Sequence, residues 1–172
     1  MRASKQLGLS VIACIAMCAA SLAAAAESDQ MIAERVLGPQ WRQLSQRAGM
    51  AFVGTVLKGE TRPAGTDRTP SSIDFAFKVD RAIAGVEPGQ ILTIHEWTGA
   101  TSLHRPLRTG ERVLLFLYPP SRLGFTSPVG GSQGQITIDG TKKTLDQLQR
   151  AIRAARAQQI GSSRPGLSER GE

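Results

Sequence analysis

Cysteine is almost absent from this chain of 172 residues. The two cysteines, Cys14 and Cys18, both lie within the first 26 residues, which have the features of a removable leader. A chain that loses this leader has no thiol, which excludes disulfide bonds, thiolate catalysis and metal sites built from cysteine. The fold therefore depends on its apolar core. A thiol-free chain also suits an oxidising compartment, where a stray thiol mispairs.

The leader covers residues 1–26. Two basic side chains open it, no charge occurs from residue 7 onward, and four alanines end it. This pattern is typical of a secretory signal peptide, with cleavage expected after Ala26. The sequence thus predicts an exported protein, either periplasmic or secreted. Two alternatives stay open: lipidation at Cys14, because the preceding residues resemble a lipobox, and an uncleaved membrane anchor.

Acidic residues are fewer than basic ones, and no long apolar run follows the leader. The chain has 21 Lys and Arg against 14 Asp and Glu, so loss of the leader's two basic residues leaves 19 against 14, or +5. No second membrane span is expected. Positive charge attracts anions, but outside the cytoplasm nucleic acid is not the expected partner, and we interpret the charge mainly as a contribution to solubility.

Alternation of apolar and polar residues predicts antiparallel strands after residue 50. The clearest pattern covers 72–82, where every second residue is apolar: Ile73, Phe75, Phe77 and Val79. Further strands are predicted at 50–57, 90–97, 111–118, 124–129 and 135–139. Polar loops are predicted at 59–71 and 98–109. No βαβ pattern is present, which argues against a parallel sheet with a nucleotide crevice.

Helices are predicted on both sides of the strands, at 40–48 with Trp41 as a packing anchor and at 144–159. The expected fold class is mainly β: a small antiparallel OB-like barrel of five to six strands with flanking N- and C-terminal helices, since closure removes exposed strand edges. The expected organisation is a signal peptide at 1–26, a helical segment at 27–49, the OB-like barrel at 50–140, a C-terminal helix at 141–160 and a disordered tail at 161–172.

Five short segments carry a resemblance to a known group of proteins. They are AFVGTV (51–56), FAFKVDRAIAG (75–85), GQILTI (89–94), TGERVLLFL (109–117) and VGGSQGQI (129–136). The chain resembles uncharacterised exported bacterial proteins with a domain similar to the tissue-inhibitor-of-metalloproteinases and netrin-like modules. The resemblance implies an OB-fold and an exported interaction module. The animal inhibitors chelate a protease zinc through an N-terminal cysteine, which a chain beginning at Glu27 lacks, so no site residue is carried over.

One cluster hints at a metal site. His95 and Glu96 are neighbours on a predicted strand, so their side chains point to opposite faces, and the spacing is not that of an H-E-x-x-H helix. His104 lies in a loop. We interpret both histidines as exposed side chains, weak candidates for a metal, and expect no cofactor. Asp74 and Asp80 read as the ordinary solvated face of one strand.

Catalytic motifs are also missing. Residues 130–134 (GGSQG) have glycines but no P-loop lysine and no following helix, so they read as a corner between strands. No catalytic residue is assigned, and the leading hypothesis is a non-enzymatic binding module. A hydrolytic or metal enzyme remains as a weaker alternative.

Five side chains are candidates for contact with a protein or a cell-envelope component. They are the arginines of the two predicted loops and the tryptophan at a strand end beside them: Arg62, Arg68, Arg105, Arg108 and Trp97. Two other functions stay open. One is a modulator or inhibitor-like partner of an exported protease. The other is an oligosaccharide- or oligonucleotide-binding OB domain, since OB-folds bind both kinds of ligand. The oligomeric state is not predicted.

Overall fold

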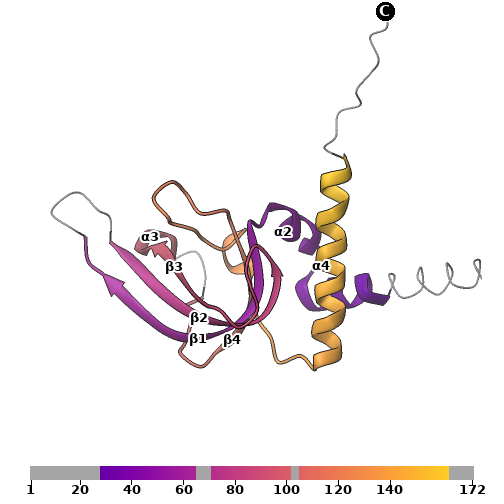
Figure 1. The fold of residues 1–172 in the computed structure, drawn as a ribbon, viewed down its shortest axis with the longest axis horizontal. Coiled ribbons are helices and arrows are strands. Elements are labelled where there is room, and N and C mark those ends of the chain that lie inside the picture. The colour runs from indigo at the N-terminus through magenta and orange to yellow at the C-terminus, as the bar shows by residue number, and fades with distance from the viewer. Residues whose placement is uncertain (1–27, 65–70, 102–104, 163–172) are drawn as a thin grey trace, which may run out of the picture.

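The fold is a five-stranded antiparallel sheet with helices gathered mainly at one side of it (Figure 1). The computed structural model describes residues 28–64, 71–101 and 105–162. The predicted signal peptide and most of the predicted tail lie outside these ranges. The chain is mainly β, as the alternation of residues predicts. Within the same ranges, no helix has both the length and the apolar character needed to cross a membrane.

The strands follow the order β3-β2-β1-β4-β5 across the sheet. Their bounds are Met50–Arg62 for β1, Ser72–Ala84 for β2, Ile91–Trp97 for β3, Arg112–Leu117 for β4 and Gln135–Thr137 for β5. β1 pairs with β2 over its whole length, but with β4 only from Met50 to Thr55. The distal half of the β1–β2 hairpin therefore projects beyond β4.

Helices precede, interrupt and follow the strands. Residues 28–37 are helical, and the labelled helices are α2 (Trp41–Arg47), α3 (Thr98–Thr101), the 3₁₀ turn η1 (Gly131–Gly134) and α4 (Lys142–Ser162). α2 and α4 confirm the two helices that the sequence predicts. Figure 1 shows α2 and α4 together at one side of the sheet, with α3 at the opposite end.

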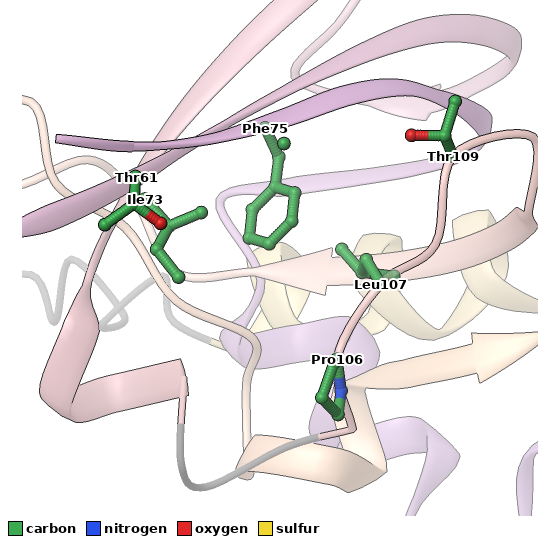
Figure 2. A pocket seen from close by; sticks show the side chains of 7 residues that line it. Thr61, Ile73, Phe75, Pro106, Leu107 and Thr109 are labelled. Carbon is green, nitrogen blue, oxygen red and sulfur yellow. The ribbon is translucent and has the colours of Figure 1, made fainter.

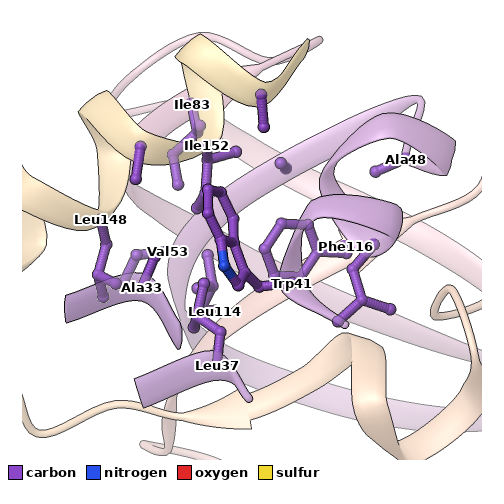
Figure 3. Packing of buried hydrophobic residues seen from close by; sticks show 14 of the residues in the cluster. Ala33, Leu37, Trp41, Ala48, Val53, Ile83, Leu114, Phe116, Leu148 and Ile152 are labelled. Carbon is purple, nitrogen blue, oxygen red and sulfur yellow. The ribbon is translucent and has the colours of Figure 1, made fainter. Parts of the chain in front are cut away.

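Strand β4 is buried on both faces, which explains its continuous apolar run. Alternate residues enter two different cores, since successive side chains of a strand point to opposite faces. The helix-side cluster lies between the sheet and the helices and includes Trp41, Val53, Leu114, Phe116 and Ile152 (Figure 3). The sheet-enclosed cluster lies on the other face and comprises Phe52, Val56, Phe75, Phe77, Val79, Ile94, Val113, Leu115 and Leu117.

The helix-side cluster confirms the packing that the sequence predicts for both helices. Trp41 is only 3% exposed and lies in Figure 3 among Phe116, Leu114 and Ile152, so it is the packing anchor of α2. The predicted apolar stripe of α4 is also buried. Its members are Leu145, Leu148, Ile152 and Ala155.

Three predicted segments differ from the structure. The loop expected from residue 59 begins only after Arg62, because Lys58–Arg62 pair with β2 despite their polar side chains. The strand expected at 124–129 is reduced to two isolated bridges, at Phe125 and Pro128. α4 continues to Ser162, two residues past the predicted helix boundary at residue 160, so Gly161 does not end the helix.

A closed barrel is not confirmed, since the strand order ends at β3 on one edge and β5 on the other. The segment 125–128 nevertheless lies between two strands. The Thr126 amide donates to the His95 carbonyl of β3 at 2.9 Å, and the Tyr118 amide, which follows β4, donates to the Ser127 carbonyl at 3.0 Å.

Candidate functional site

A pocket of about 320 Å³ opens between the projecting β1–β2 hairpin and the segment that leads into β4. We call it the tip pocket. It is lined by Gly59, Thr61, Ile73, Phe75, Pro106, Leu107 and Thr109. Figure 2 shows the Phe75 ring pointing from the hairpin toward Leu107. The lining residues thus come from both of the polar loops that the sequence singles out.

The pocket exists because a glycine faces an aromatic ring across two strands. Gly59 of β1 is the direct partner of Phe75 in β2. A Cβ atom at Gly59 would lie 2.9 Å from a Phe75 ring carbon, so a side chain there would push the ring or fill the space. The ring itself is 6% exposed and belongs to the sheet-enclosed cluster. The pocket floor is therefore continuous with the core.

The opposite wall is fixed by one carboxylate. Glu111 accepts hydrogen bonds from the Arg105 guanidinium, from the Thr137 hydroxyl at 3.0 Å and from the Arg108 amide at 3.2 Å. The side chain is 13% exposed. These bonds tie both ends of residues 105–111 to each other and to β5, so Pro106, Leu107 and Thr109 hold their places in the wall.

The same contacts shift the ionisation of the pair. The Arg105 guanidinium holds the pKa of the Glu111 carboxyl below its usual range, and the Thr137 and Arg108 bonds act in the same direction against the effect of burial. The carboxylate in turn raises the pKa of Arg105. The wall is thus held by an ion pair whose formal charges cancel beside the pocket.

The three candidate arginines that the structure describes do not form one free cationic cluster. Arg62 follows Thr61 on β1, so it points to the opposite face, where it donates to Asp74. Arg105 is bound to Glu111. Arg108 is exposed and makes no ion pair with any residue that the structure describes. Arg68 lies outside the described residues. Arg108 is thus the unpaired candidate beside the tip pocket.

The histidine and acidic candidates separate as the strand geometry predicts. His95 and Glu96 face opposite sides of β3: the His95 side chain is 40% exposed, whereas Glu96 is fully buried. His104 lies outside the described residues. Within the described ranges, no group of three or more His, Cys, Asp or Glu side chains is placed to hold a metal ion.

Asp74 departs from the predicted solvated face, whereas Asp80 is exposed as predicted. The Asp74 side chain is 13% exposed, and it contacts His95 Nδ1 at 2.7 Å and accepts from Arg62. The Asp80 side chain is 23% exposed and accepts from Arg112 at 3.2 Å. Each carboxylate therefore has a cationic or imidazole partner on another strand, which single-strand alternation does not reveal.

Trp97 lies apart from the tip pocket. The side chain is 50% exposed, and its ring contacts Phe125 edge to face, with centroids 5.7 Å apart. It lines a second hollow together with Tyr118 and Pro119. Exposure makes it a contact candidate, as the sequence suggests, but at a different place from the arginines.

Sequence reasoning missed Gly59, Phe75 and Leu107 as pocket residues. Phe75 is predicted only as core, and Gly59 only as part of a polar loop. The available signal was a glycine and an aromatic residue on flanking strands, but it becomes informative only once the register that pairs them is known.

No known protein family matches this chain, and comparison with curated proteins finds no significant relative. The resemblance to exported bacterial proteins with a netrin-like domain therefore stays a prediction.

Proposed function

We propose that the chain is an exported, non-enzymatic binding module. It takes an apolar side chain of a protein partner, or an apolar group of another envelope component, into the tip pocket. The observation that carries the proposal is a preformed hollow with a Phe75 floor and a wall braced by Glu111. Its volume of about 320 Å³ is near the lower end of the range for small-ligand pockets. Such a space suits one or two side chains better than a large cofactor.

The surroundings of the pocket support a protein partner. Thr61 and Thr109 are exposed lining residues that offer hydroxyl groups at the rim. Arg108 adds an exposed positive charge in the same segment as Leu107 and Thr109. An apolar floor inside a polar and basic rim is the usual anatomy of a small protein contact. The preferred partner therefore presents an apolar residue next to an acidic one.

We further propose that the strands close into an OB-like barrel. Support comes from the segment 125–128, which forms a parallel bridge with His95 in β3 and an antiparallel bridge with Leu117 in β4. A short sixth strand at 125–128, paired with both β3 and β4, would enclose the sheet-enclosed cluster without help from helices. Export rests on the predicted signal peptide at 1–26, which makes the periplasm or the medium the place of action.

Site-specific photo-cross-linking tests the proposed pocket. A photoreactive residue at Thr61 or Thr109 is expected to give a covalent adduct with one defined envelope component in cells that export the full chain. Thr93, an exposed threonine of β3 outside the pocket, is the matched control. Additional replacement of Leu107 by Trp, which fills the pocket, should remove the adduct. Equal labelling at Thr93, or adducts that survive the Leu107→Trp change, would contradict the proposal.

A further inference from the structure

A second hollow lies where β3 ends and shares no residue with the tip pocket. We call it the aromatic groove. It has a volume of about 240 Å³ and is lined by Trp97, Tyr118, Pro119, Ser121, Phe125, Thr126 and Ser127. Trp97 is 50% and Tyr118 is 38% exposed. Exposed aromatic side chains gathered around one hollow mark a candidate site for a ligand or a partner.

The groove has a defined shape because its rings are held at a right angle. The Trp97 and Phe125 planes meet at 80° with centroids 5.7 Å apart. Phe125 is fixed by the bridge to His95 and by the turn that begins at Ser121, whose amide donates to the Phe125 carbonyl at 2.8 Å. The two rings in edge-to-face contact form an angular wall of the hollow, against which a small, rigid apolar ring can pack.

The hydrogen bonds within the groove leave side-chain donors for a ligand. Three of its backbone carbonyls already accept: Tyr118 O from the Thr126 hydroxyl at 2.6 Å, Ser127 O from the Tyr118 amide and Ser121 O from the Gly124 amide. The Ser121 hydroxyl also accepts, from the Phe125 amide at 3.2 Å. The Trp97 indole N–H and the Tyr118 hydroxyl make no hydrogen bond with any residue that the structure describes. A complementary ligand therefore presents hydrogen-bond acceptors and has few hydrogen-bond donors of its own.

The charge beside the groove is positive, which also favours a ligand that presents hydrogen-bond acceptors. Arg122 is exposed in the turn that carries Ser121 and Phe125, and it makes no ion pair within the described ranges. No acidic residue lines the groove. The carboxylate on the neighbouring strand face, Asp74, already contacts Arg62 and His95. A ligand with a negative charge beside its acceptors is thus complementary.

We propose that the aromatic groove binds a proline-rich segment of an exported partner protein, in the polyproline II conformation and with an acidic residue beside the prolines. A polyproline II chain makes no internal hydrogen bonds, so its carbonyls point outward as acceptors, and its prolines have no N–H. Pyrrolidine rings fit slots between aromatic side chains, and this preformed conformation loses little entropy on binding. The acidic residue would pair with Arg122.

Tryptophan fluorescence tests this proposal on the purified chain. Trp41 is 3% exposed, so a ligand in the groove should act on the emission of Trp97. The probe is an acetylated, amidated peptide of one glutamate followed by eight prolines. We expect a saturable change with this peptide, weaker binding when lysine replaces the glutamate, and no saturable change with a neutral hexasaccharide.

Substitutions in the groove test whether the peptide binds there. Calorimetric titration with the same peptide measures binding to each variant, because Trp97 is itself the fluorescent reporter. Trp97→Ala should abolish binding, and Tyr118→Phe, which removes only the hydroxyl, should weaken it about 2- to 10-fold. Ile91→Ala is the matched control, since Ile91 is 70% exposed at the other end of β3 and should leave binding unchanged. Failure of the proline peptide to saturate, preferential binding of the saccharide, equal binding of the lysine peptide, or an emission change caused by protein concentration alone would each overturn the proposal.

Discussion

Glu111 shows how one side chain positions a functional wall. The carboxylate collects hydrogen bonds from Arg105, Thr137 and the Arg108 backbone, and these bonds hold Leu107 against the sheet-enclosed cluster. Its lowered pKa has a direct consequence for stability. A carboxylate that binds its proton less readily when folded stabilises the fold above its unfolded pKa, and this contribution disappears as the pH falls through the folded value.

Replacing Glu111 with glutamine should make the chain less stable at pH 7 and less sensitive to acid. The neutral amide loses the charge-assisted bonds to Arg105, and it has no proton to take up at low pH. Urea unfolding midpoints at pH 7 and pH 3.5 measure both effects. The wild-type midpoint should fall more between these two pH values than the variant midpoint.

Glu87→Gln is the matched control for this prediction. Glu87 is exposed in the turn between β2 and β3, and its carboxylate makes no ion pair or hydrogen bond in the part of the chain that the structure describes. Its substitution should leave both midpoints close to those of the wild type. An identical acid response in the Glu111 and Glu87 variants would show that Glu111 does not brace the wall.

At the scale of elements, α4 holds α2 in place by side-chain donors as well as by apolar contact. Arg156 Nη1 donates to the Ser45 carbonyl at 2.7 Å and also to the Ala48 carbonyl. These carbonyls stand at the end of α2, where a helix leaves its last acceptors without an internal partner. Arg156 therefore caps the C-terminus of α2 and joins this helix to α4.

Replacing Arg156 with alanine should destabilise the chain by about 1 kcal/mol, a value that reflects two charge-assisted bonds near a partly exposed surface. Thermal or urea unfolding at pH 7 measures the loss. Lys143→Ala removes one positive charge from an exposed position of the same helix and should have little effect. Equal destabilisation by both variants would attribute the effect to charge alone.

The elements were predictable to the extent that their pattern is local. β2 follows from the alternation of Ile73, Phe75, Phe77 and Val79, and α4 follows from its 3–4 spacing. The end of β1 was not predictable, because Lys58–Arg62 are polar and become a strand only through pairing with β2. The brief edge at 125–128 likewise depends on partners far along the chain.

The candidate site was predictable only in part. The sequence indicates the two segments that meet at the tip pocket, but it selects the arginines of these segments as contact residues. Two of these arginines instead form ion pairs with Asp74 and Glu111. The lining residues Gly59 and Phe75 depend on cross-strand register, which alternation along one strand does not contain. Pairing, rather than composition, decides which side chains remain free.

At the scale of the whole molecule, two cores share one sheet. The helix-side cluster is covered by α2, α4 and residues 28–37, whereas the sheet-enclosed cluster is built from β1 to β4, with Val86 and Leu107 packed against it from segments between strands. The N-terminal helical residues are joined to α4 by Asp29, which accepts two bonds from Arg150 at 2.8 and 2.9 Å. Cleavage after Ala26 would leave this connection intact.

Hydrogen exchange tests whether the strands close. The Thr126 amide donates to the His95 carbonyl across the gap between β3 and the segment that follows β4. In a closed barrel we expect this amide to exchange within about tenfold of the Val129 amide, which donates to the Phe116 carbonyl of β4 at 2.7 Å. Exchange of Thr126 at the rate of an unstructured peptide would show an open sheet.

Strand β1 has two neighbouring strands along its first half and only one along its second half. We call the first half the root and the second half the tip, which opens more easily. Near Met50 the strand has neighbours on both sides, whereas beyond Val56 it has only β2. Local opening needs the least free energy where fewest neighbours must be released. Gly59 and Thr61 stand on that tip, so this side of the pocket can adjust to the shape of what it holds, whereas Phe75, paired with β3 and part of the sheet-enclosed cluster, keeps the pocket floor in place.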